Sequence, residues 1–192
     1  MTGDSYVALA TISAAFLSGL VSIVNLTIAK EHKISELRQA WIDSIRNDLA
    51  NLIAMYVTVL NSFICDKSKK NGHIDYVEFY EKHISSISSA TELHHRIILR
   101  LNNTKEHEKI IAMLTDIEYS IVDLERLKNT NEMKYLFDEL NNLSQILLKK
   151  EWERVKHGEP SFNKMKKFAL TLIFIPALYI LYKLPLILSQ LS

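Results

Sequence analysis

The chain has 192 residues, of which 48% are hydrophobic and 23% are charged, and its formal net charge at pH 7 is +1. The single cysteine, Cys65, excludes an intramolecular disulfide and a zinc site built from several cysteines. The charges are of mixed sign along the chain, so we expect no direct sequence-specific DNA binding. The four glycines form no phosphate-binding motif, and we expect no cofactor.

Residues 6–29 are the first of two long apolar stretches. A helix needs about 20 predominantly apolar residues to cross a hydrocarbon core about 30 Å thick. A cleaved signal peptide is the alternative interpretation. Such peptides have a basic leader, whereas the one ionisable side chain in residues 1–5 is that of Asp4, which is acidic. We therefore predict a retained transmembrane helix over 6–29, preceded by a short outer N-terminus.

Small and polar residues recur at helical spacing on one face of this segment. They are Thr11, Ala15, Ser18, Ser22 and Asn25, and Gly19 forms a small-xxx-small pair with Ala15. Small residues let helices approach closely in lipid, and hydroxyl or amide groups hydrogen-bond across the contact for about 1 kcal/mol each. The face predicts either helix pairing, within the chain or between copies, or the lining of a wetted pore.

Residues 30–159 are predicted to form a helical bundle. No Gly or Pro separates its first helix from the membrane segment, so the sequence allows one continuous rod. Apolar residues at helical spacing predict four helices, which carry Ile34 to Phe63, Tyr76 to Leu101, Ile110 to Leu127 and Leu136 to Val155.

Capping patterns mark the starts of the last two helices. Asn103 or Thr104 is predicted to cap the third helix, with Glu106 in the capping-box position. Asn129 with Glu132 repeats the pattern before the fourth helix.

Residues 168–188 form the second apolar stretch, and residues 189–192 follow it. Pro176 favours a kink in this span. The preceding segment, 160–167, is basic, and we expect Lys164, Lys166 and Lys167 to contact anionic lipid.

The flanking charges orient both spans. Lys30, Lys33 and Arg38 follow the first span, and the three lysines of 160–167 precede the second, so the bundle is predicted to be cytoplasmic and both termini to lie outside. Four helices joined by short loops agree with this topology, because the fourth returns to the side on which the first began. The predicted fold class is all-α: N-terminal and C-terminal transmembrane helices flanking a cytoplasmic up-down four-helix bundle.

One pair of residues suggests chemistry. Arg100 and His107 flank the turn between the second and third predicted helices, and their spacing resembles the active-site motif of the HEPN ribonucleases. This resemblance implies that the pair acts around a scissile phosphate. We expect no metal site, because His94 and His95 are adjacent and point to different helix faces.

Two further stretches carry a second resemblance: ISELRQAWIDSIRNDL at 34–49 and LLKKEWERVKHGE at 147–159. Together they resemble the signatures of a family of small two-transmembrane bacterial proteins of phage-defence systems. The layout is similar to the two-transmembrane effectors of retron systems and to the HEPN-like membrane accessory proteins of RNA-targeting CRISPR systems. The resemblance implies a cell-arresting effector that damages the bacterial inner membrane.

The same stretches also have a structural interpretation. An antiparallel bundle would bring the two tryptophans to its membrane-proximal end, where they and nearby arginines would form a clamp with ion pairs to Asp43, Asp48, Glu151 and Glu153. The predicted clamp residues are Arg38, Trp41, Arg46, Trp152 and Arg154.

Three functions remain open from the sequence. The first is a non-enzymatic effector that oligomerises and permeabilises the membrane, with a defence-system protein or ribonucleoprotein as a partner of the bundle. The second is a membrane-anchored scaffold or regulator without pore activity. The third is a membrane-tethered HEPN-like ribonuclease that uses Arg100 and His107, for which His107→Ala would abolish the phenotype.

Overall fold

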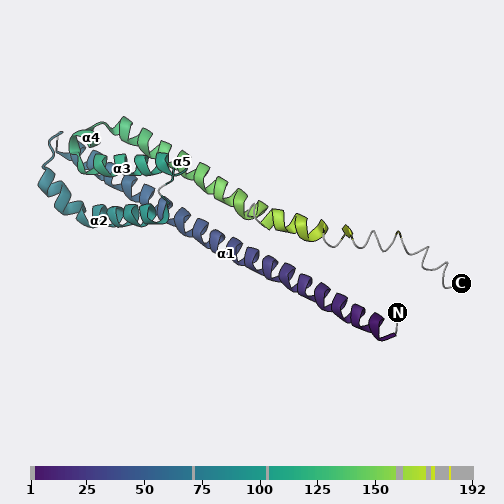
Figure 1. Ribbon diagram of the computed structural model, residues 1–192. Coiled ribbons are helices and arrows are strands. Elements are labelled where there is room, and N and C mark those ends of the chain that lie inside the picture. The colour runs from purple at the N-terminus through teal and green to yellow at the C-terminus, as the bar shows by residue number, and fades with distance from the viewer. Residues whose placement is uncertain are drawn as a thin grey trace. The chain divides into compact units, whose positions relative to one another are not determined.

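The computed structural model describes residues 3–70, 72–102, 104–158, 162–171, 174–175 and 182, and the described chain is all-helical (Figure 1). Most of the predicted second span, including Pro176, lies outside these residues. The helices are α1 (Gly3–Lys69), α2 (Tyr76–Arg100), α3 (Glu108–Val122), α4 (Leu124–Lys128) and α5 (Thr130–His157). Residues 162–171 are also helical.

Helix α1 is continuous over 67 residues, which confirms that no break separates the apolar segment from the first helix of the bundle. It contains the one stretch among the described residues that is long and apolar enough to cross a membrane. None of this stretch is buried within the described structure. At 1.5 Å per residue, the predicted span 6–29 is about 36 Å long, enough for a hydrocarbon core of about 30 Å.

The chain divides into two compact units, one of which is Gln39–Glu153. In this unit the C-terminal part of α1 packs with α2, α3, α4 and α5 around one apolar core (Figure 1). Tyr56 of α1 stacks on Phe137 of α5 with ring centroids 5.8 Å apart, and Phe63 of α1 meets the edge of Phe79 in α2 at 5.6 Å. The predicted apolar stripes therefore converge as expected for a helical bundle.

The prediction of a single third helix is wrong, because the chain breaks at Asp123. This residue has an extended backbone (φ −92°, ψ 102°) that ends α3, and its carboxylate accepts a hydrogen bond from the backbone N–H of Glu125 at the start of α4. Aspartate is a poor helix-interior residue and a good N-cap, so one side chain accounts for both the stop and the restart.

The predicted cap of the third helix is also wrong for Thr104, while Asn103 lies outside the described residues. Helix α3 begins after His107, which makes no side-chain capping hydrogen bond. Glu106 contacts the ammonium of Lys150 in α5, at 3.0 Å.

The cap of the last helix forms at Asn129. Its side-chain oxygen accepts from the backbone N–H of Glu132 (3.3 Å), and its amide donates to the Glu132 carboxylate (2.9 Å). The second contact joins two side chains, whereas a capping box would return the Glu132 carboxylate to the backbone of Asn129.

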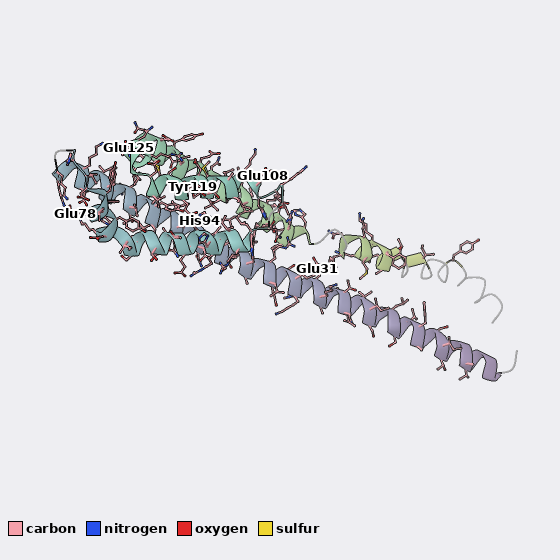
Figure 2. All side chains as sticks on the ribbon, turned by 60° about the vertical axis from the view of Figure 1, so that its left-hand side comes forward. Glu31, Glu78, His94, Glu108, Tyr119 and Glu125 are labelled. Carbon is pink, nitrogen blue, oxygen red and sulfur yellow. The ribbon has the colours of Figure 1, made fainter. Side chains whose placement is uncertain are left out.

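The other unit contains the described residues up to Arg38 and from Arg154 onward. Within it, Gly158 follows α5 with a φ of +69°, and a Cβ added there would lie 2.9 Å from the Glu31 carboxylate. Glu31 projects from α1 (Figure 2). The backbone angle favours glycine at position 158, whereas the flexible Glu31 side chain could move away from a Cβ.

Candidate functional site

The small-polar face of α1 is fully exposed on the described chain. Thr11, Ala15, Ser18, Gly19, Ser22 and Asn25 are all exposed. The hydroxyls of Thr11 and Ser22 donate to the carbonyls of Val7 and Ser18, each at 2.9 Å. These hydroxyls are therefore satisfied within their own helix, although each oxygen keeps acceptor capacity toward a neighbour.

The basic segment lies at the start of the last described helical stretch, residues 162–171. Lys164, Lys166 and Lys167 are exposed there, and the apolar Phe168 that follows them is 66% exposed. Lysines next to exposed apolar residues match the arrangement that attracts anionic headgroups.

The residues of the predicted clamp are divided between the two units. Trp41, Arg46 and Trp152 belong to Gln39–Glu153, whereas Arg38 and Arg154 belong to the other unit. Trp41 packs against the core and Trp152 is 39% exposed. Arg46 pairs with Asp43 at 2.7 Å along α1.

Asp48, which was predicted to pair with the clamp arginines, pairs with two arginines of α2. The guanidinium of Arg100 donates to the Asp48 carboxylate and to the Ser44 hydroxyl. Arg96 approaches the other carboxylate oxygen of Asp48 at 3.5 Å. The Asp48 side chain is 90% covered, while Arg100 and Arg96 keep 32% and 45% of their side-chain surface exposed, so the contact between α1 and α2 is partly desolvated.

His107 is held by a different contact, with a backbone group. Its Nδ1 lies 3.0 Å from the Asn102 carbonyl oxygen, and its Nε2 is buried without a hydrogen-bond partner. The structure thus places Arg100 in an ion pair with α1 and His107 against the α2–α3 connection. The two residues proposed for phosphate chemistry have separate structural partners.

Among the residues that the structure describes, two groups of side chains have metal-binding atoms within 4.8 Å of one another. One is His94, His95 and Glu118, in which His94 Nε2 lies 3.2 Å from the Glu118 carboxylate. His94 lies between the helices (Figure 2). Burial lowers the pKa of His94, Glu118 opposes this effect and His95 reinforces it. The other group is Glu106, His107 and Glu151.

Tyr56 has a buried hydroxyl without a partner at a small cavity also lined by Glu118. Burial and the nearby Glu118 carboxylate raise the pKa of Tyr56. Its phenol therefore stays protonated in the physiological range.

The sequence contains an indication that two of these carboxylates are buried. Asp48 follows Ile45 by three residues, and Glu151 follows Leu147 by four, so each carboxylate occupies a position on an apolar stripe. A charged residue on a buried face requires a partner. Such positions predict a buried contact, but they do not identify the residue that makes it.

Comparisons with known proteins give no relative: no family model, no curated protein and no solved structure matches the chain significantly.

Proposed function

We propose that this protein is a non-enzymatic effector of a bacterial anti-phage, abortive-infection system that oligomerises in the inner membrane and permeabilises it on activation. Its spans would be 6–29 and 168–188, with the helical bundle cytoplasmic and both termini outside. The defence setting rests on the resemblance of residues 34–49 and 147–159 to a family of small two-transmembrane bacterial proteins of phage-defence systems, and on a layout similar to that of the retron effectors.

The observation that carries the proposal is the exposure of α1 around its whole circumference. Ile12, Phe16 and Leu17 are each 59–67% exposed, and no described side chain from 11 to 28 is buried. An apolar surface of this extent is costly in water and favourable in lipid.

The small-polar face gives the span a means of association. Ala15 and Gly19 allow close approach, and a Cβ added at Gly19 would meet no atom within 4 Å. Asn25 makes no side-chain hydrogen bond among the described residues, so its amide is available to a neighbouring helix. Several copies that turn this face inward would surround polar groups, which suits a water-filled opening.

The bundle is proposed to hold the trigger. Its surface combines acidic and basic residues, as in the ion pairs of Lys82 with Asp66 and Lys128 with Glu125. A defence-system protein or ribonucleoprotein is the proposed partner. A non-enzymatic role is supported by the pairing of Arg100 with Asp48, because the carboxylate already neutralises the cation that a ribonuclease would direct at phosphate.

The test is to induce the full chain in bacteria and to follow a membrane-potential dye with and without phage infection. We expect depolarisation and growth arrest, and we expect Ser22→Leu to abolish both because it blocks close helix approach. Ile23→Leu, on another face of the same helix, is the matched control and should depolarise as wild type does. Cells that stay polarised under every condition would refute the proposal.

A membrane-anchored scaffold is the second candidate, favoured by the hydroxyls of Thr11 and Ser22 that bond within their own helix. It predicts a detergent-solubilised protein that stays monomeric and leaves liposomes intact. The effector predicts oligomers whose formation Ser22→Leu prevents. Cleavage of RNA by the purified full chain would instead favour the ribonuclease.

A further inference from the structure

The connection between α2 and α3 meets α5 at a group of three side chains, Glu106, His107 and Glu151. One donor atom of each lies within 4.8 Å of the others. Two ligand atoms that each lie about 2.1 Å from a tetrahedral zinc ion are about 3.4 Å apart. The distances between the three donor atoms therefore need to shorten by little more than an ångström.

The imidazole of His107 is prepared for such a role. A carbonyl oxygen accepts only, so the contact with Asn102 at 3.0 Å places the proton on Nδ1 and leaves a lone pair on Nε2. His107 is 6% exposed, and Nε2 has no hydrogen-bond partner. A ligating histidine commonly fixes its tautomer through a bond of this kind from its other nitrogen.

The two carboxylates supply negative charge at the same place. Glu151 is 6% exposed, which is unusual for a glutamate. Glu106 contacts the Lys150 ammonium through one oxygen, Oε1, at 3.0 Å. A carboxylate has a second oxygen, so this ion pair does not prevent coordination.

We propose that Glu106, His107 and Glu151 bind a divalent transition-metal ion of the zinc class. One imidazole nitrogen and two carboxylate oxygens suit Zn²⁺ better than Mg²⁺ or Ca²⁺, which prefer all-oxygen sites. Three protein ligands leave a fourth position for water. The ion fastens the α2–α3 connection to α5 and stabilises the bundle, whichever function the membrane segment has.

The group of His94, His95 and Glu118 is the weaker candidate and provides the control. His94 Nε2 is already 3.2 Å from Glu118, and its Nδ1 is buried without an acceptor that would fix the tautomer. A ligand at this group would lack the supporting backbone contact that His107 has.

The sequence did not predict the site, because its ligands come from a connection and from a helix more than 40 positions later. Histidine spacing within one helix cannot reveal such a combination.

The experiment uses the full chain in detergent micelles, stripped with EDTA and titrated with ZnCl₂ or with CoCl₂, whose visible absorption reports nitrogen and oxygen ligation. We expect one Zn²⁺ per chain, a rise of several degrees in Tm with saturating Zn²⁺, and little response to Mg²⁺. His107→Gln and Glu151→Gln should each weaken Zn²⁺ binding at least tenfold and abolish the Co²⁺ band.

His95→Ala is the matched control and should leave both signals unchanged. If His107→Gln fails to fold, Glu106→Gln, on the partly exposed connection, takes its place with the same expected loss. The proposal is overturned if wild type binds no Zn²⁺ at about 100 µM, a concentration between a millimolar and a micromolar dissociation constant. It is equally overturned if binding is lost in His95→Ala but kept in His107→Gln.

Discussion

Arg100 of α2 donates to the carboxylate of Asp48 in α1, and the same guanidinium nitrogen reaches the Ser44 hydroxyl. Removing the Asp48 charge would leave the partly buried guanidinium of Arg100 without its counter-ion. We expect Asp48→Asn to lower the free energy of unfolding by about 1–3 kcal/mol, the penalty for an unsatisfied charged partner. Urea titration of the full chain in micelles, followed by circular dichroism, measures the change.

The control is Asp43→Asn, which breaks the more exposed pair with Arg46 on the same helix. Exposed pairs contribute about 0–1 kcal/mol, so this variant should stay near wild type. Equal losses in the two variants would contradict a special role for the Arg100 contact.

His94 makes the bundle sensitive to acid. Burial lowers its pKa in the folded state, so the unfolded chain binds the proton more readily. We expect stability to be at its full value above the unfolded pKa of about 6.5 and to decline as the pH falls below it. Thermal unfolding between pH 7.5 and pH 5.5 measures the slope, and His94→Gln should flatten it. A wild-type Tm that rises on acidification would contradict this assignment.

Asp66 responds to pH over a lower range. Hydrogen bonding by Lys82 holds the pKa of the Asp66 carboxyl below its usual value, with further contributions from the charges of Lys82 and His83. The associated stability is present above the unfolded pKa of about 3.9 and is lost as the pH falls through the lower folded value. Asp66→Asn should therefore lower the Tm at pH 7 while leaving it nearly unchanged near pH 2.

The turn after α1 depends on Gly72, which has a φ of +88°. A Cβ added there would meet no atom within 4 Å, so the cost of Gly72→Ala comes from the backbone alone, about 1 kcal/mol. Gly72→Asn should cost less, since asparagine tolerates the left-handed region. Chemical denaturation of both variants tests the order, and an equal or larger loss for Gly72→Asn would contradict it.

The N-terminus of α2 depends on Asp75, whose side chain accepts from the backbone N–H groups of Val77 and Glu78 at 2.9 and 3.1 Å. Asp75→Ala should destabilise the bundle by about 0.5–2 kcal/mol, and Asp75→Ser should recover most of the loss. Hydrogen exchange in the first turn of α2 provides a local measurement. Unchanged exchange in Asp75→Ala would show that the cap contributes nothing.

The helices could be predicted because their signals are local. The apolar stripe from Ile45 to Phe63 and the Asn129 cap each depend on residues a few positions apart, and both appear in the structure. The break at Asp123 is different, because the apolar spacing from Ile110 to Leu127 continues across it. A capping side chain overrode that periodicity.

The contacts between helices could not be predicted to the same extent. The partners of Asp48 and Glu106 lie in other helices, at Arg100 and Lys150. Each of these carboxylates also had an alternative nearby in the sequence, an arginine of the predicted clamp for Asp48 and a capping position for Glu106. Only packing in three dimensions decides between such alternatives.

The positions of Trp41 and Trp152 make the protein's own fluorescence a reporter of where unfolding begins. Each tryptophan lies within two residues of a boundary of the compact unit Gln39–Glu153, and the chain has no others. Tryptophan emission therefore follows the fraying of these boundaries, whereas circular dichroism follows all the helices together. Coincident melting curves would identify the bundle as one cooperative unit. A fluorescence transition below the temperature of the circular dichroism transition would show that the ends of the unit open while its core stays folded.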